Sequence, residues 1–321
     1  MSTIVMTGGT SGFGAVAATR MLEAGEVRLI LGARRPGAAG ATFVPEATPT
    51  DVPPSDTVRP EPIPVDLSEL DSVREFAAVT RERLGDNMID ALVLNGGMIR
   101  PDVAGRTAEG FETTFAVNHL AHYLLLRLLL PVLADRAIVV LTTSGTHDPA
   151  TGAGLVPPRH ADAQLLAHPD RDPDLDSRAS KAGQHAYTAS KLCAVLVVRS
   201  LSEHPDAQGG RLTVIAYDPG QVFGTGLAKD LSLPLRVAWS LFGTPLGWPL
   251  RRFSPTLNSR TDAGNTLADL ALGRSAPPPG RTYAALRRGR LTWIEPSELA
   301  RKPEVAQALW NDSAKLVGLP A

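Results

Sequence analysis

The sequence predicts a doubly wound α/β fold, in which about seven parallel strands form a sheet with helices on both faces. Short apolar strand patterns alternate with helix patterns along most of the chain, which is typical of parallel sheets. A glycine-rich turn joins the first strand to the first helix. Because 321 residues suit one large α/β unit, we expect a single domain over residues 1–321.

The expected strands are short runs that are rich in β-branched and other apolar residues. They cover residues 3–7, 27–32, 62–65, 89–94, 137–143, 212–217 and 281–284. The expected helices place apolar residues three and four positions apart. They cover residues 12–24, 67–84, 113–134, 179–203 and 303–317.

Three segments interrupt this alternation. Residues 36–60 are rich in proline, threonine and acidic residues, and they predict an extended, solvated loop. Residues 146–183 precede the helix that ends at residue 203; a connection of this length is either a flap facing the substrate or a surface excursion. Residues 225–260 contain a strongly apolar run, 231–253, which predicts a substrate lid, helices packed on the core, or contact with a membrane surface.

Composition argues against several classes of function. The formal net charge is −1 at pH 7, so no overall field attracts nucleic acid or an anionic membrane. The single cysteine, Cys193, cannot form an intramolecular disulfide, which suits a reducing cytoplasm. We expect no secretory leader and no transmembrane span. No metal site is expected, because ligand spacing is absent from the four central histidines, His147, His160, His168 and His185.

The turn after the first strand predicts a Rossmann-type dinucleotide site. Residues 7–14 read Thr-Gly-Gly-Thr-Ser-Gly-Phe-Gly between an apolar strand and a helix, which is the context in which such a turn binds pyrophosphate. The glycines permit a tight turn, close approach of the phosphates and close helix packing. Together with the helix amides, we expect contacts from Gly8, Thr10, Ser11, Gly12, Phe13 and Gly14.

The end of the second strand indicates which cofactor is bound. NAD-binding folds place an acidic residue there for the ribose 2′-hydroxyl, whereas an arginine accommodates a 2′-phosphate. This chain has Arg34 and Arg35 and no acidic residue at that point, and a guanidinium suits phosphate. The sequence therefore predicts NADP, with NADPH preferred over NADH. Asp66, after the third strand, is expected to bind the adenine amino group or to cap the next helix.

Tyr187 and Lys191 predict proton transfer. Four residues apart on the helix 179–203, the phenol and the ammonium lie on one face. A fixed positive charge favours phenolate, so we expect Lys191 to lower the pKa of Tyr187 from about 10 toward about 7. Such a group can give or take a proton at neutral pH while a cofactor carries the redox chemistry. The chain is therefore predicted to be a hydride-transferring oxidoreductase.

In order and spacing, these motifs resemble those of the short-chain dehydrogenase/reductase family. The resemblance rests on the turn 7–14, Asp66-Leu67, Leu94-Asn-Gly-Gly97, Asn118, Ser144, Tyr187 with Lys191, and Pro219-Gly220. It implies that Tyr187 is the general acid in reduction and that Ser144 holds the substrate carbonyl oxygen. It also implies that Lys191 tunes Tyr187 and binds the nicotinamide ribose. Asn118 would anchor a water that relays protons to Lys191.

The resemblance also implies further cofactor contacts, at Leu67, Asn95, Gly96, Gly97, Tyr187, Lys191, Pro219, Gly220, Val222 and Thr225. In pattern the chain is most similar to light-dependent protochlorophyllide reductases and retinol-dehydrogenase-like enzymes. Where the former have Pro-Gly-Cys, this chain has Pro219-Gly-Gln221. Many members of the family pair through the helices that correspond to 113–134 and 179–203, whereas others are monomeric, so a monomer or a homodimer is expected.

Three functions follow from these observations. The first is an NADPH-dependent carbonyl reductase or alcohol dehydrogenase in the cytoplasm, which acts on a bulky, apolar ketone or aldehyde. The apolar run 231–253 is the reason to expect a bulky substrate. The second is a light-driven C=C reductase of the protochlorophyllide type, and the third is a non-catalytic NADP-binding sensor. The complete set of four candidate catalytic residues favours the first: Asn118, Ser144, Tyr187 and Lys191.

Overall fold

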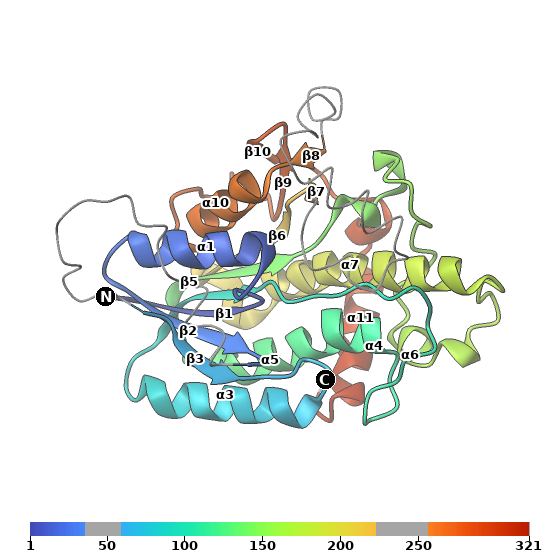
Figure 1. The fold of residues 1–321 in the computed structure, drawn as a ribbon, viewed down its shortest axis with the longest axis horizontal. Coiled ribbons are helices and arrows are strands. Elements are labelled where there is room, and N and C mark those ends of the chain that lie inside the picture. The colour runs from blue at the N-terminus through green and yellow to red at the C-terminus, as the bar shows by residue number, and fades with distance from the viewer. Residues whose placement is uncertain (36–58, 223–255, 321) are drawn as a thin grey trace.

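An eight-stranded sheet runs through the middle of the fold in a computed structural model (Figure 1). The structure describes residues 1–35, 59–222 and 256–320. The predicted loop at 36–60 and the predicted lid at 225–260 lie, apart from their last residues, outside the described residues. Thr225, a predicted cofactor contact, also lies outside them.

Seven strands of this sheet are parallel to one another, as the sequence predicts. Along the sheet the order is β10-β9-β6-β5-β4-β1-β2-β3, and only the pair β9–β10 is antiparallel. The strands are β1 (Ser2–Thr7), β2 (Val27–Ala33), β3 (Glu61–Pro64), β4 (Ile89–Leu94), β5 (Leu133–Thr142), β6 (Leu212–Asp218), β9 (Tyr283–Arg287) and β10 (Arg290–Trp293). The strand β10 was not predicted; it forms a hairpin with β9 through two residues with positive φ, Arg288 and Gly289.

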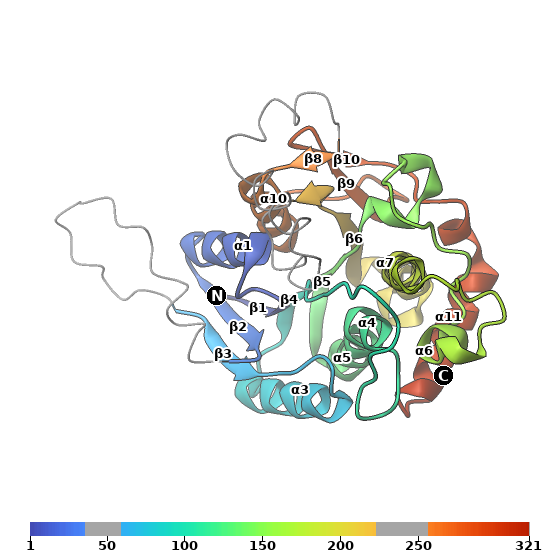
Figure 2. The same cartoon turned by 45° about the vertical axis from the view of Figure 1, so that its right-hand side comes forward.

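Helices cover both faces of the sheet, which confirms the doubly wound prediction (Figure 2). One face carries α1 (Gly12–Glu23) and α10 (Arg260–Ala271), which pack against each other. The other carries α3 (Leu70–Leu84), α5 (Ala121–Leu129), α7 (Ala179–Glu203) and α11 (Pro303–Leu316). The sequence analysis expected no helix at the position of α10.

The helix expected at 113–134 is interrupted. It consists of α4 (Thr113–Phe115), a π-helical turn (Ala116–Leu120), α5 and a 3₁₀ turn (Leu130–Val132). Among the described residues, Thr113–Val132 is the one helical stretch long and apolar enough to cross a membrane by length and composition. Of its most apolar window, 72% is buried inside the fold, which is what a helix in the core of a domain shows.

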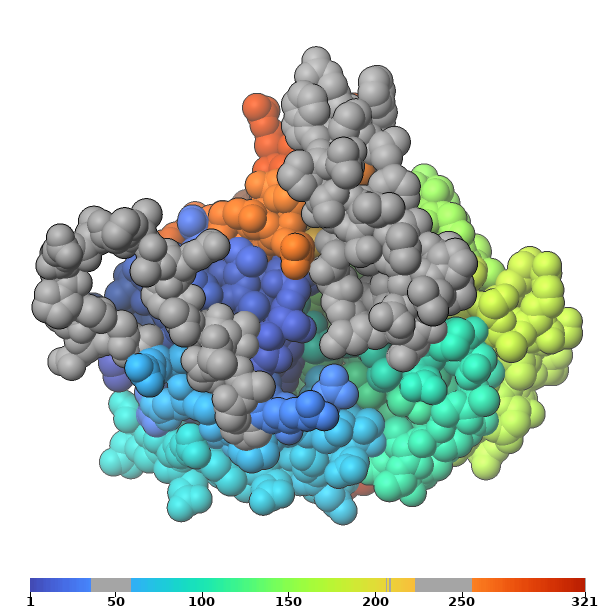
Figure 3. All heavy atoms as spheres, in the orientation of Figure 1, coloured from blue at the N-terminus to red at the C-terminus, as the bar shows by residue number. Residues whose placement is uncertain are grey.

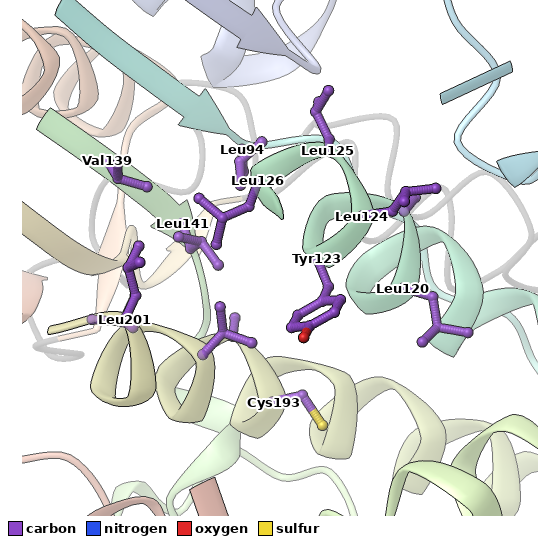
Figure 4. Packing of buried hydrophobic residues seen from close by; sticks show 14 of the residues in the cluster. Leu94, Leu120, Tyr123, Leu124, Leu125, Leu126, Val139, Leu141, Cys193 and Leu201 are labelled. Atoms are coloured by element: carbon purple, nitrogen blue, oxygen red, sulfur yellow. The ribbon is translucent and has the colours of Figure 1, made fainter. Parts of the chain in front are cut away.

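Buried apolar residues of the strands β4 and β5 and the helices α5 and α7 pack together in one cluster. In Figure 4, Leu94, Leu126 and Leu141 point into this cluster, and the ring of Tyr123 points toward α7. Cys193 of α7 is fully buried there. The helix α7 therefore has apolar packing along most of its length, which fixes its position relative to the sheet.

The C-terminal helix α11 lies across α7 and reaches α5. The hydroxyl of Tyr123 on α5 donates to the carbonyl of Trp310 at 2.9 Å, and their rings meet edge to face. The Oγ of Ser200 on α7 donates to the carbonyl of Ala306 at 3.1 Å. These bonds bind both long helices to α11, so the chain itself covers part of their outer surface.

The insertion at 146–183 is folded rather than extended. It forms 3₁₀ turns at Pro149–Thr151 and Pro169–Arg171 and a short helix, α6 (Ala163–Ala167), which packs beside α11. In Figure 3 residues of the insertion, coloured yellow-green, stand at the right-hand margin of the molecule. The hydroxyl of Thr188 donates to the carbonyl of Val156 at 2.8 Å. The insertion thus contacts the turn of α7 that carries Tyr187.

Candidate active site

The carboxyl ends of β1 and β4 meet where the strand order reverses, which is where doubly wound folds bind cofactors. Gly8 follows β1 with φ +67°, and a Cβ there would lie 2.6 Å from the backbone nitrogen of Gly96. Only glycine combines this φ with so close an approach. The turns after the two strands therefore lie directly against each other.

The N-terminus of α1 opens onto these turns. Ser11 is its N-cap; among the described residues its side chain makes no capping hydrogen bond, and the first turn holds no acidic residue. A Cβ on Gly14 would lie 2.1 Å from the carbonyl oxygen of Gly8, so the helix starts tightly against the turn. Residues 10–13 are at least partly exposed. Unpaired amides at such a helix end bind anions, so this end fits the pyrophosphate of a dinucleotide.

The two predicted 2′-phosphate ligands lie at the end of β2. Arg34 and Arg35 follow the strand directly, and both are exposed. Both side chains can therefore contact a ligand without any loss of buried contacts in the core. Their contact with a 2′-phosphate stays a prediction.

Asp66 follows β3, at the same edge of the sheet. Its Oδ1 accepts hydrogen bonds from the backbone nitrogen and the hydroxyl of Ser68, at 2.9 and 2.7 Å. The N-cap of α3 is Glu69, so the alternative that Asp66 caps this helix is wrong: it closes a turn before the helix begins. Leu67 packs on the turn after β4, since a Cβ on Gly96 would lie 2.5 Å from its Cδ1. The expected adenine contact of Asp66 stays a prediction.

Asn95 joins the turn after β4 to the strands on both sides. Its Nδ2 donates to the carbonyl of Gly8 at 3.0 Å, and its Oδ1 accepts from the hydroxyl of Thr142 at 2.9 Å. Thr142 ends β5, one position before the loop that carries Ser144. A single amide therefore connects the predicted phosphate-binding turn with the predicted catalytic loop.

Asn118 lies in the π-helical turn and holds the next part of the same loop. Its Oδ1 accepts from the backbone nitrogen of Met98 at 2.8 Å, and its Nδ2 donates to the Met98 carbonyl at 2.8 Å and to Ser190 Oγ at 3.0 Å. A Cβ on the exposed Gly97 would lie 3.2 Å from Asn118 Oδ1 and 3.5 Å from Lys191 Nζ. The Asn118 amide and the Lys191 ammonium thus both lie near Gly97. Because Gly97 has no side chain, a ligand could lie against the loop at this point.

Tyr187 and Lys191 are almost fully buried on α7, 6% exposed each. The ammonium lies 5.8 Å from the centre of the phenol ring and donates to the carbonyl of Thr142 at 3.2 Å. Burial raises the pKa of Tyr187 to about 12, against a lowering by its hydrogen bond with Ser144. Burial lowers the pKa of Lys191 to about 8, while the negative charge of Asp218 opposes that shift. The expectation that Lys191 brings the tyrosine pKa toward 7 is wrong for the chain alone, because desolvation of the phenolate dominates.

Ser144 follows β5 and is partly exposed. Behind it, the buried His147 lies with Nδ1 2.7 Å from the Ser144 carbonyl, while Nε2 accepts from the backbone nitrogen of Ser297 at 3.3 Å. The amide can only donate, so Nδ1 carries the proton and donates to Ser144. Because Nε2 accepts, the ring is neutral in this arrangement, and burial, which lowers the pKa of His147, acts in the same direction. The sequence analysis considered this histidine only as a metal ligand, and its structural role was missed.

A buried ion pair lies below the same loop. Asp218, at the end of β6, is fully buried, and its Oδ2 lies 2.7 Å from a guanidinium nitrogen of Arg287 and 3.2 Å from the Tyr283 hydroxyl. Its Oδ1 accepts from the backbone nitrogen of Gly220 at 2.9 Å. A Cβ on Gly145 would lie 3.0 Å from Oδ2. The carboxylate therefore supports the loops that carry Ser144 and Pro219, and the sequence analysis did not single it out.

We predict that Asp218→Asn lowers the free energy of unfolding by about 3 kcal/mol, because it leaves the Arg287 guanidinium buried without its counter-ion. Chemical denaturation followed by circular dichroism measures this. The matched control is Asp135→Asn, which breaks an exposed pair with Arg211 and should change stability by less than about 0.5 kcal/mol. Equal effects of the two substitutions would contradict the importance of the buried pair.

The predicted nicotinamide loop is held by a second, two-stranded sheet. β7 (Gln221–Val222) pairs with β8 (Leu257–Asn258), and Asn258 Nδ2 donates to the carbonyl of Pro219 at 3.0 Å. A Cβ on Gly220, which has φ +71°, would lie 2.3 Å from the carbonyl of Thr256. The chain thus leaves the described fold after residue 222 and returns at residue 256 beside the same loop.

Comparison with known proteins identifies the family. The sequence model described as short chain dehydrogenase matches residues 2–152. Protochlorophyllide reductase A of Oryza sativa subsp. japonica is 30% identical over 98% of this chain and 80% of its own length. The chain belongs to the short-chain dehydrogenase/reductase family. Retinol dehydrogenase 13 of Homo sapiens is 33% identical over 80% of this chain and 68% of its own length.

The fold of this short-chain dehydrogenase/reductase is matched by solved structures. An uncharacterized protein from Mycobacterium paratuberculosis aligns with a TM-score of 0.67 and 26% identity, over all of this chain and 94% of that one. Within the described residues, the short-chain dehydrogenase/reductase fold brings all four candidate catalytic side chains to the carboxyl ends of β4 and β5. Hydrogen bonds and an ion pair beside this site involve five residues that were not predicted as site residues: Thr7, His122, His147, Asp218 and Arg287.

Proposed function

We propose that this short-chain dehydrogenase/reductase is an NADPH-dependent carbonyl reductase or alcohol dehydrogenase, which acts on the ketone or aldehyde of a bulky, apolar small molecule. The observation that carries the proposal is the buried pair Tyr187 and Lys191, with Ser144 bonded to the phenol and Asn118 beside the ammonium. This set can protonate a substrate oxygen at the carboxyl edge of the sheet.

The residues of the chain supply the proton and the charge stabilisation. Bound NADPH supplies the hydride. With a pKa near 12, the Tyr187 phenol keeps its proton at neutral pH until negative charge develops on a substrate oxygen. The phenol and the Ser144 hydroxyl then both donate toward that oxygen, while Lys191, protonated below its pKa of about 8, stabilises the phenolate that remains.

Cofactor binding is proposed along the edge that joins β1, β2 and β4. The N-terminus of α1 would hold the pyrophosphate, and Arg34 and Arg35 would hold the 2′-phosphate. Asp66 and Leu67 would lie at the adenine. Residues 95–97 and the loop 219–222 would lie along the nicotinamide half, beside Lys191.

The proposed substrate class has two supports. The apolar run 231–253 adjoins the loop after Pro219 in sequence, and two relatives are named for protochlorophyllide and retinol, both largely apolar molecules. We also propose a monomer, because α11 covers part of the outer faces of α5 and α7. A cytoplasmic location is proposed because a chain with a single cysteine suits a reducing compartment.

A carbonyl panel of graded size tests the proposal. We expect NADPH oxidation in the dark with large hydrophobic ketones or aldehydes, followed by the loss of reduced-nicotinamide fluorescence. Tight binding of NADPH without turnover of any carbonyl, in the dark or under a lamp, would contradict the proposal and favour a sensor.

The second candidate is a light-driven C=C reductase, which the similarity to protochlorophyllide reductase favours. Against it stands Gln221, in the position where those enzymes have cysteine after Pro-Gly. Turnover that requires illumination would establish this candidate, and equal rates in the dark and in light would remove it.

We predict that Arg34→Ala and Arg35→Ala each raise the KM for NADPH about tenfold and leave the KM for NADH within about twofold. A charge-assisted hydrogen bond to phosphate contributes about 1.5–3 kcal/mol to binding. NADH has no 2′-phosphate, so the substitutions remove no such hydrogen bond from its complex. Steady-state kinetics with both cofactors measure the change. Arg28→Ala is the control, since Arg28 pairs with Glu61 across β2 and β3; an equal loss for both cofactors in the Arg34 and Arg35 variants would contradict the assignment.

A further inference from the structure

The hydroxyl of Thr7 contacts three polar atoms at the end of β1. Its Oγ1 lies 3.1 Å from the backbone nitrogen of Asn95, 3.2 Å from that of Gly96 and 3.0 Å from His122 Nε2. Both amides can only donate, so Oγ1 accepts from them. The proton of the hydroxyl therefore goes to the histidine, and Nε2 is the acceptor.

This assignment fixes the tautomer of His122. With Nε2 accepting, the ring proton is on Nδ1, which lies 3.2 Å from the carbonyl oxygen of Asn118 and donates to it. Burial is the main cause that lowers the pKa of His122 to about 4; the bond to the Asn118 carbonyl opposes this shift, and the charge of Lys191 adds a smaller lowering. The imidazole is therefore neutral at neutral pH. Thr7 donates a hydrogen bond to His122, and His122 donates one to the Asn118 carbonyl.

These hydrogen bonds hold both ends of the segment Asn95–Met98, which is called the strip 95–98 below. Thr7 holds the strip at Asn95 and Gly96, and the Asn118 side chain holds it at Met98. His122 joins the two holders. Gly97, at the centre of the strip, is the exposed residue beside which Asn118 Oδ1 and Lys191 Nζ come together.

We propose that His122 is a positioning residue of this active site, which with Thr7 holds the strip 95–98 in place beside Lys191. The proposal rests on the proposed function, in which this strip lies along the nicotinamide half of the cofactor. Among the described residues, the hydrogen bonds of His122 go to Thr7 and to the backbone carbonyl of Asn118, so His122 acts through these two residues.

The two hydrogen bonds of His122 can be removed together or one at a time. His122→Phe removes both and keeps a ring of similar size. His122→Gln can present an acceptor near the place of Nε2, and His122→Asn can present a donor near the place of Nδ1. Thr7→Val removes the hydroxyl at nearly constant volume, and Thr7→Ser restores it.

Amide hydrogen exchange of the peptide that covers residues 95–98 tests the role without any turnover. We expect His122→Phe and Thr7→Val each to speed this exchange about tenfold, since one or two buried hydrogen bonds are lost. The Kd for NADPH, measured by fluorescence titration, should rise about fivefold. Thr7→Ser should match the parent in both measurements.

A matched control lies one turn away. His119→Phe removes a second buried histidine, in the π-helical turn, whose side-chain hydrogen bond among the described residues goes to Ser313 of α11 at 2.7 Å and not to residues 95–98. We expect His119→Phe to leave the exchange of 95–98 and the Kd for NADPH unchanged. Folding of every variant is checked by circular dichroism.

Unchanged exchange and unchanged Kd in a folded His122→Phe or Thr7→Val variant would overturn the proposal. If His122→Phe does not fold, Thr7→Val and His122→Gln decide the question on the same two measurements. If no carbonyl is ever turned over, the proposed function fails, while altered exchange at 95–98 would still establish the positioning role.

Discussion

Replacement of Tyr187 by phenylalanine is expected to lower kcat at least about 100-fold, since a positioned general acid contributes roughly 10²–10⁴-fold. The substitution removes the one donor that burial keeps protonated beside Ser144. The ring itself remains, so the packing of α7 should not change. NADPH oxidation with the best carbonyl of the panel measures kcat, and fluorescence titration should give a Kd for NADPH within about threefold of the parent.

Tyr123→Phe is the control for this experiment. Its hydroxyl is also buried and bonds to the Trp310 carbonyl, so its loss should cost about 1 kcal/mol of stability and leave kcat unchanged. An unchanged kcat in Tyr187→Phe for every accepted carbonyl would remove Tyr187 as the proton donor.

The second large effect concerns Lys191. Its pKa is lowered from 10.5 to about 8 by burial, so as the pH rises through about 8 the folded chain loses this ammonium. We expect kcat/KM to fall on the alkaline side of pH 8, because the phenolate left after proton donation loses its positive partner. Lys191→Met should lower kcat/KM about 100-fold at pH 7 and abolish this alkaline limb.

Stability should move in the opposite direction over the same range. Below pH 8 the lysine is protonated in both states, and the cost of burying its charge is fully present. Between about pH 8 and 10.5 the unfolded chain binds the proton that the folded chain has lost, so the contribution of Lys191 to stability rises with pH.

Lys181→Met, on the first turn of the same helix and outside the site, is the control and should keep the alkaline limb. A pH profile that is the same in Lys191→Met and in the parent would contradict the assignment of the limb to Lys191. Denaturation midpoints between pH 7 and 10 measure the stability of the parent and of Lys191→Met.

The sheet and α7 could be predicted from the sequence because their signals are local. Apolar runs of four to eight residues mark β1, β2, β4 and β6, and α7 was predicted at its observed bounds, Ala179–Glu203. The turn 7–14 could be recognised because its glycines lie between an apolar strand and a helix, where a tight turn requires glycine. These patterns do not determine the order of the strands, because strand order depends on pairing between segments that are distant in sequence.

The helix α10 was not predicted because glycine and alanine make up most of its buried face, beside Leu267 and Leu270. Gly264 lies against α1 so closely that a Cβ there would be 2.6 Å from the carbonyl of Phe13. A face with four glycine and alanine residues and only two leucines shows weak apolar contrast, on which the recognition of helix periodicity depends. The hairpin strand β10 was missed since it is short and only partly buried.

The electrostatics of the site could not be predicted, because they depend on burial and on partners that are distant in sequence. The spacing of Tyr187 and Lys191 correctly placed them on one helix face, yet the desolvation that raises the tyrosine pKa comes from the surrounding fold. Asp218 and Arg287 are separated by 69 positions, and Thr7 and His122 by 115. No local pattern joins such pairs.

Because Cys193 is buried, its reaction with a thiol reagent can report when α7 separates from α5 and the sheet. The thiol is the one cysteine of the sequence, lies two residues beyond Lys191 and has no exposed surface, and burial raises its pKa. An alkylating reagent needs an accessible thiolate, so it can react only when the catalytic helix separates from α5 and the sheet. The rate of alkylation therefore measures how often the active site comes apart, with no substrate, no label and no engineered residue.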